Sequence, residues 1–115
     1  MLRGMLGGGF VALLMTALPA LADEQADLAA KGRARVEANC KRCHAIGADD
    51  KSPHDKAPPF RLVAERHPSE NLAEALAEGI VAGHPDMPVF VMSTEQIEGF
   101  LAYLNSLGPV GAPAK

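Results

Sequence analysis

Five consecutive residues, Cys40-Lys41-Arg42-Cys43-His44, carry a recognisable chemical pattern. They include both cysteines of the 115-residue sequence, and a histidine directly follows the second. Two thiols three positions apart on one helical turn lie on roughly one face, so both can reach the edge of a single flat macrocycle. The adjacent imidazole is then placed to reach an iron at the centre of that ring. This spacing predicts covalent attachment of haem c through Cys40 and Cys43, with His44 as an axial iron ligand.

Three other interpretations of the two cysteines fit their surroundings less well. A structural zinc site would need two further cysteine or histidine ligands in a second knuckle, which the sequence lacks. A thioredoxin-type dithiol would follow a strand of a βαβ unit, whereas the residues before Cys40 have a helical pattern. A short-range disulfide remains open, but it would give His44 no role.

The N-terminal segment predicts export. An early positive charge precedes a long apolar run, and Ala20-Leu21-Ala22 places small residues at the positions that determine cleavage. We expect a secretory signal peptide over residues 1–22, cleaved after Ala22, and a mature periplasmic chain over residues 23–115 that does not insert into a membrane. The apolar run is also close to the length of a membrane anchor, but Pro19 beside the cleavage site favours cleavage.

The mature chain would be small and mildly acidic. Removing residues 1–22 deletes one charge, Arg3, and leaves ten basic against fourteen acidic side chains. It contains no basic run and no interleaving of aromatic and basic residues, which excludes nucleic acid as a partner. A single domain of this size makes a thin core. A buried macrocycle would complete that core, so we predict that the haem-free polypeptide is poorly folded.

Hydrophobic periodicity predicts an all-α fold. A first helix is expected from about Glu24 to Lys41, because Leu28, Gly32 and Val36 repeat every fourth residue on one face. It leads directly into the cysteine pair. The polar, proline-containing stretch that follows, residues 49–56, is expected to be a loop.

Two further helical segments are predicted before the last helix. A short helical turn is expected at residues 62–64, and a helix from Glu70 to about Gly79 is expected to be capped by Ser69. Its apolar stripe contains Leu72, Leu76 and Ile80. Residues 83–93 contain two prolines and no periodicity, so we expect an irregular loop.

The last helix is predicted from its cap and its apolar spacing. Ser93 or Thr94 is the expected cap, and the apolar residues follow the i, i+3, i+4, i+7 pattern of one helical face. These residues are Ile97, Phe100, Leu101 and Leu104. The helix is expected to end at Gly108-Pro109, and residues 109–115 are expected to form a flexible tail.

With this layout, the chain closely resembles the class I cytochromes c over nearly all of its mature region. The resemblance implies a small cytochrome c fold, in which the N- and C-terminal helices cross over a covalently bound haem c. The family has a glycine eight residues before the first haem cysteine, where the helices cross, and Gly32 holds that position here. Val36 takes the neighbouring apolar position. Phe100 and Tyr103 match the apolar and aromatic contacts of the last helix.

The resemblance also implies a methionine as sixth iron ligand. Met87 lies between two prolines, and its Met-Pro step resembles the axial ligand segment of the family. Met92 is the alternative, although it can equally fill space as a hydrophobic residue at the start of the last helix. His84 is a further competitor for the iron, and it can equally be a surface imidazole.

An axial histidine usually donates its other ring N–H to an acceptor that fixes its orientation. In the family this acceptor is the carbonyl of a proline beyond the motif, which points to Pro58 here and leaves Pro59 as an alternative. Tryptophan is absent, so the usual partners of the haem propionates are not identified. His54 and His67 adjoin polar, proline-containing segments and are expected to face solvent.

An iron with both axial positions filled has no open site for a substrate, so its natural chemistry is to accept and donate one electron. We therefore expect a single-haem electron-transfer protein rather than an enzyme. It could act as a soluble carrier or as a subunit of an oxidoreductase complex, with a dehydrogenase, reductase or oxidase as redox partner. The charges that could border the exposed haem edge and meet an acidic partner are Lys41, Arg42, Lys51 and Lys56. The alternatives are a haem sensor or haem enzyme with a labile sixth ligand, and a domain that mainly docks a partner subunit.

Overall fold

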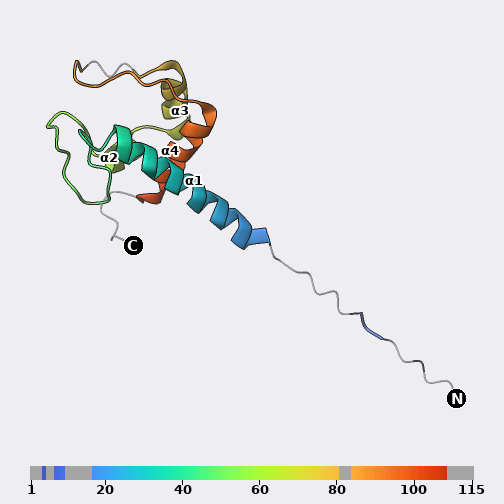
Figure 1. Cartoon of the computed structure of the whole chain (residues 1–115). Coiled ribbons are helices and arrows are strands. Elements are labelled where there is room, and N and C mark those ends of the chain that lie inside the picture. The colour runs from blue at the N-terminus through green and yellow to red at the C-terminus, as the bar shows by residue number, and fades with distance from the viewer. Residues whose placement is uncertain (1–3, 5–6, 10–16, 81–83, 109–115) are drawn as a thin grey trace.

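The computed structural model describes residues 4, 7–9, 17–80 and 84–108. Within these residues the protein contains four helices and no strand: α1 (Ala17–Asn39), α2 (Phe60–Arg66), α3 (Ser69–Glu78) and α4 (Thr94–Ser106). Figure 1 shows α1 crossing α4, and both α2 and α3 also pack against α4. The predicted all-α fold with crossing first and last helices is confirmed.

The crossing of α1 over α4 depends on two glycines. A Cβ atom added to Gly32 would lie 1.9 Å from the carbonyl oxygen of Gly99 and 3.0 Å from the backbone nitrogen of Phe100. Any side chain at position 32 would therefore collide with the backbone of α4. The cost of about 1 kcal/mol for a glycine inside a helix is offset here by the close approach that it permits.

One hydrophobic core lies around this crossing. Val36 of α1 and Leu104 of α4 are the most deeply buried large side chains, at 1% and 2% exposure. The loop after the cysteine pair and all three other helices add side chains to the same core. Its remaining buried members are Ile46, Phe60, Leu72, Leu76, Ile97, Phe100 and Tyr103.

The ends of α1 differ from the prediction of a helix from Glu24 to Lys41. The helix starts earlier, at Ala17, because the alanine- and leucine-rich residues before Glu24 are strong helix formers. It stops at Asn39, where the hydrogen-bond pattern widens: the N–H of Cys40 and that of Lys41, five residues on, both donate to the carbonyl of Val36, at 2.8 and 3.0 Å. The cysteine pair therefore lies in the turn that follows the helix.

The two predicted helix caps have opposite outcomes. Pro68, not Ser69, occupies the N-cap position of α3, since its extended backbone precedes the helix and its carbonyl accepts the N–H of Leu72 at 3.1 Å. Ser69 is already helical and cannot cap. Ser93 does cap α4: its hydroxyl accepts the N–H of Gln96, and the Gln96 side chain accepts the N–H of Ser93.

The connecting segments agree with the predicted loops where they are described. Residues 49–56 and 84–93 form turns and irregular backbone. The helical turn expected at residues 62–64 is part of the longer helix α2. Gly83 and the proposed flexible tail, residues 109–115, lie outside the described residues, as does most of the proposed signal peptide. None of the described helices is long and apolar enough to span a membrane.

Candidate functional site

The turn that follows α1 holds both cysteines and is closed by hydrogen bonds. The N–H groups of Cys43 and His44 donate to the carbonyl of Cys40, at 3.1 and 2.9 Å. Both cysteines are free thiols and are partly buried. Two sulfur atoms and an imidazole thus leave the same turn, which is the arrangement that the sequence spacing predicts.

Burial raises the pKa of the Cys40 thiol, with nearby Arg35 opposing the effect and Cys43 adding to it. Redox-active cysteines have the opposite property, because a lowered pKa supplies the reactive thiolate. The environment of Cys40 therefore does not resemble that of a thioredoxin-type nucleophile.

His44 is held in one orientation by the chain itself. Its Nδ1 atom lies 2.7 Å from the carbonyl oxygen of Pro58, and its ring packs against Phe60 with a centroid separation of 4.9 Å. A carbonyl oxygen can only accept a hydrogen bond, so Nδ1 must carry the hydrogen. The lone pair of the neutral ring is then on Nε2, where it is free to bind a metal. Of the two prolines left open by the sequence, the structure pairs Pro58 with His44.

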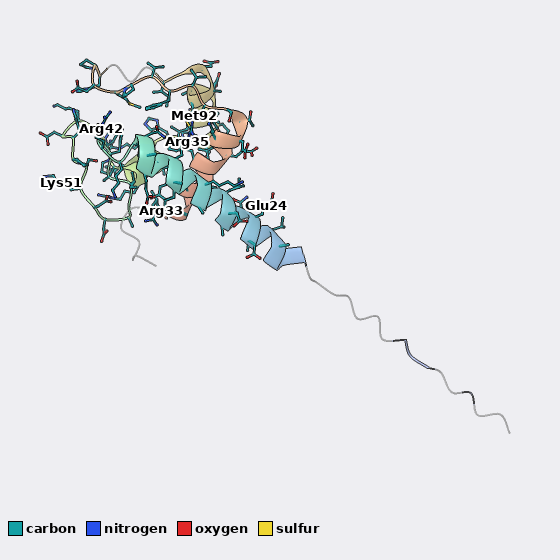
Figure 2. The ribbon with its side chains drawn as sticks, viewed as in Figure 1. Glu24, Arg33, Arg35, Arg42, Lys51 and Met92 are labelled. Carbon is teal, nitrogen blue, oxygen red and sulfur yellow. The ribbon has the colours of Figure 1, made fainter. Side chains whose placement is uncertain are left out.

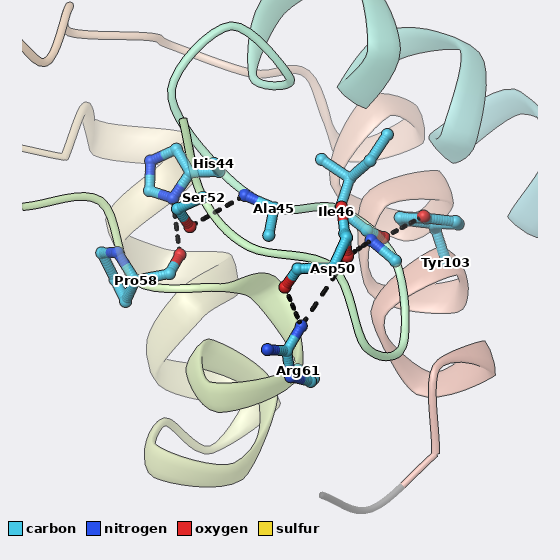
Figure 3. A network of polar contacts seen from close by, with 9 residues as sticks. His44, Ala45, Ile46, Asp50, Ser52, Pro58, Arg61 and Tyr103 are labelled. Carbon is cyan, nitrogen blue, oxygen red and sulfur yellow. Dashed lines mark hydrogen bonds and ion pairs between the residues drawn. The ribbon is translucent and has the colours of Figure 1, made fainter. Parts of the chain in front are cut away.

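Two hydrogen bonds hold the segments on either side of the His44–Pro58 contact together. Phe60 donates its N–H to the carbonyl of Ala45 at 2.9 Å, and Ala45 donates its own N–H to the hydroxyl of Ser52 at 2.9 Å. These bonds close the loop between α1 and α2 onto Ala45, the residue next to His44, and Figure 3 shows the bond from Ala45 to Ser52. The loop between α1 and α2 therefore packs against the segment that carries His44.

A second set of contacts ties this loop to α4 and α2. The hydroxyl of Tyr103 donates to the carbonyl of Ile46, and Arg61 donates to the carbonyl of Asp50 at 2.8 Å. The carboxylate of Asp50 accepts the N–H of Gly47 at 2.9 Å. Because Tyr103 belongs to α4, the helix that crosses α1 also holds the segment that follows the cysteine turn.

The two methionines differ in their surroundings. Met92 packs against the hydrophobic core, and its N–H donates to the carbonyl of Leu76 at 2.9 Å (Figure 2). Met87 is half-buried in a turn of the loop between α3 and α4, where its N–H donates to the carbonyl of His84 at 3.2 Å. Met92 thus has the packing role that the sequence allowed for it, which leaves Met87 as the methionine without a described core contact.

Two of the remaining histidines behave differently from each other. His67 is exposed, as expected. The side chain of His54 is 30% exposed and donates from Nε2 to Asp86 at 3.1 Å, so the expectation that His54 faces solvent is met only in part. A partner 32 residues away could not be foreseen from local polarity. The four cationic residues proposed near a haem edge are all exposed, and Figure 2 labels two of them, Arg42 and Lys51.

Sequence reasoning missed several residues that position the site. Gly99 had a signal, because it interrupts a helix otherwise built from helix-forming residues. Ser52 and Asp50 had none, since both lie in a polar stretch that resembles any solvated loop. Tyr103 was expected to contribute a contact to the helix crossing, but not a hydrogen bond to Ile46.

Fold and site together define a small all-α protein in which crossed terminal helices present a Cys-x-x-Cys-His turn with an oriented histidine. The family model for Cytochrome c matches residues 29–108 of this chain. The chain therefore belongs to the Cytochrome c family. No curated protein and no solved structure is similar enough to this chain to count as a match.

Membership of this family makes the chain a haem c electron-transfer protein with redox proteins as partners. The donor set fits that cofactor, because the two thiols share a turn and the tautomer of His44 leaves Nε2 able to bind iron. Iron binding at Nε2 would give His44 a function, whereas a simple disulfide between the two cysteines would give it none.

Proposed function

We propose that the mature chain is a periplasmic carrier that holds one haem c and transfers one electron at a time between redox proteins. The oriented imidazole of His44 is the observation that carries this proposal. The sequence has one pair of cysteines, which is enough for one attachment site. When bound, the haem iron would supply the one-electron chemistry.

The chain's own residues would keep that iron in one environment. Cys40 and Cys43 would hold the haem to the turn that follows α1, and His44 would bind the iron through Nε2. The Pro58 carbonyl keeps the proton of His44 on Nδ1, which also raises the basicity of Nε2. Phe60 covers one side of the imidazole and restricts its rotation.

We propose Met87 as the sixth ligand, because Met92 is already engaged in packing against the core. A thioether is a weak ligand, so the turn that ties Met87 to His84 matters for keeping the sulfur in place. A histidine and methionine pair would place the reduction potential toward the high end of the haem range.

Replacement of each methionine tests the ligand assignment. We expect Met87→Leu to lose the weak sulfur-to-iron band of the oxidised protein and to bind carbon monoxide when reduced. Met92→Leu is the matched control and should keep the band, because it changes a packing residue. Loss of the band only in Met92→Leu would overturn the assignment. Carbon monoxide binding by the unaltered protein would instead favour a sensor or enzyme with a labile sixth ligand.

We further propose that export removes residues 1–22. Residues 20–27 are exposed, so the cut removes no described core contact. It would leave Asp23 and Glu24 at the start of α1, where negative charge is favoured by about 0.3–1 kcal/mol. Intact-mass analysis of the periplasmic fraction should find a chain that begins at Asp23 and carries one haem. A full-length or cytoplasmic product would refute this part of the proposal.

A further inference from the structure

A cluster of metal-binding side chains lies between the two loops that carry the proposed haem residues. His54 belongs to the loop between α1 and α2, whereas His84 and Asp86 belong to the loop between α3 and α4. One ligand atom from each residue lies within 4.8 Å of the other two. We call these three residues the His54 cluster, and none of their side chains is a proposed haem ligand.

The dimensions of the His54 cluster suit a small divalent ion. A tetrahedral zinc ion with bonds of about 2.0–2.1 Å to nitrogen and oxygen keeps its ligand atoms about 3.3 Å apart. His54 Nε2 and Asp86 Oδ2 are already 3.1 Å apart, and the rings of His54 and His84 meet edge to face at 5.2 Å. A modest movement of the His84 ring would complete a three-ligand site.

The ligand types narrow the choice of ion. Two imidazoles and one carboxylate favour first-row transition metals such as zinc, nickel or copper over calcium and magnesium, which prefer oxygen ligands. The Asp86 side chain is 65% exposed and that of His54 is 30% exposed, so an ion can enter from solvent. The fourth coordination position would be filled by water.

Backbone hydrogen bonds hold each histidine next to a proposed haem residue. His54 donates its N–H to the carbonyl of Cys43 at 3.1 Å, and its own carbonyl accepts the N–H of Ala57 at 3.1 Å. The carbonyl of His84 accepts the N–H of Met87 at 3.2 Å. An ion that joins His54 to His84 would therefore link the cysteine turn to the Met87 turn.

Existing hydrogen bonds of the two histidine rings compete with the ion at this cluster. His54 Nδ1 accepts the N–H of Lys56 at 3.0 Å, which places the ring hydrogen on Nε2, facing Asp86. Metal binding at Nε2 moves that hydrogen to Nδ1 and breaks the bond from Lys56. His84 Nδ1 likewise accepts the N–H of Asp86 at 3.3 Å. The affinity should therefore be below that of a closed structural zinc site.

We propose that His54, His84 and Asp86 bind one divalent first-row transition-metal ion, which joins the two loops. The test uses the haem-loaded protein, because free Cys40 and Cys43 thiols would bind zinc themselves. After chelator treatment and dialysis, calorimetric titration with zinc chloride should show one ion per chain. His54→Ala and His84→Ala should each weaken binding by about tenfold or more.

His67→Ala is the matched control, since it removes an exposed histidine outside the cluster and should leave zinc affinity unchanged. Zinc should raise the melting temperature of the parent and of His67→Ala, but not that of His54→Ala. The haem absorption spectrum shows that each variant is folded and loaded, and Asp86→Asn offers a milder change if an alanine variant does not fold.

Three results would overturn the proposal. They are absence of zinc binding by the parent, unchanged affinity in His54→Ala and His84→Ala, and equal loss in His67→Ala. Ligation of the haem iron by His84 would give the first of these results. The outcome is independent of the proposed carrier function, which the spectra of the methionine variants test without zinc.

Discussion

Substitution of Gly32 by alanine tests whether the crossing of α1 and α4 sets the stability of the domain. The new Cβ atom would lie 1.9 Å from the carbonyl oxygen and 2.4 Å from the carbonyl carbon of Gly99. Both are backbone atoms, so no side-chain rotation can relieve the contact. A carbon next to a carbonyl oxygen needs about 3.3 Å. The helices would have to separate by about 1.4 Å, the difference between these two distances.

The structure sets the size of the effect. A gap of 0.5–1 Å already forfeits about a quarter to a half of a van der Waals contact. Val36 of α1 shares the core with Phe100 and Leu104 of α4, and each such side chain contributes about 1.5–3 kcal/mol when fully buried. Losing half of the summed contribution of these three side chains amounts to about 2–4 kcal/mol. The better helix propensity of alanine returns about 1 kcal/mol. We expect a net loss of about 1–3 kcal/mol.

Gly99→Ala is the matched control, because it makes the same chemical change on the facing helix. Its added Cβ would meet the Gly32 nitrogen and the Leu28 carbonyl oxygen at 3.3 Å, which a shift of a few tenths of an ångström relieves. Its free energy of unfolding should change by less than that of Gly32→Ala. Guanidinium denaturation of the haem-loaded variants, followed by circular dichroism, measures both. A Gly32→Ala variant as stable as the parent, or more stable than Gly99→Ala, would refute the reasoning.

Three other predictions concern α4 and can be measured by the same denaturation. Tyr103→Phe should cost about 1–3 kcal/mol, because it leaves the buried carbonyl of Ile46 without its donor; no loss would contradict the hydrogen bond. Burial raises the pKa of Tyr103 above the value of about 10 that it has in the unfolded chain. The stabilisation that Tyr103 provides should therefore be complete below about pH 10 and should decline as the pH rises further. The parent should therefore lose more stability than Tyr103→Phe between mildly and strongly alkaline pH, and parallel losses would argue against it. Ser93→Ala should cost about 1 kcal/mol through loss of the cap, whereas Thr94→Ala should change stability by less than about 0.5 kcal/mol.

Local patterns in the sequence predicted the helices and the cysteine turn well, since those features depend on neighbouring residues. Ser93 could be recognised as a cap because its partner Gln96 is three residues away. Ser69 has the same residue type, but the helix begins one residue too early for it: Pro68 has the extended backbone of a cap, and its carbonyl accepts the N–H of Leu72.

Local sequence patterns could not predict contacts between distant residues. The family resemblance identified Gly32, and Gly99 can be noticed as a glycine inside a helix. That the two glycines face each other becomes visible only when the helices are placed across each other. In the same way, nothing near His54 in the sequence indicates Asp86, because two loops from opposite halves of the chain must meet before the pair exists. Spacing predicts which residues share an element, and packing decides which elements meet.

The two proposed axial ligands are supported to different degrees, and this difference bears on function. His44 is fixed by its own N–H, by the Pro58 carbonyl and by the ring of Phe60, on a segment that Tyr103 ties to α4. Met87 has one described backbone hydrogen bond, to His84 in its own turn. Segments with few buried contacts open at a lower free-energy cost than the core. If Met87 ligates the iron as proposed, its side of the haem is the one that opens first. The bond from His54 to Asp86 joins the loop between α1 and α2 to the loop that carries Met87. Such contacts between the two loops would then help to decide whether added ligands can reach the iron.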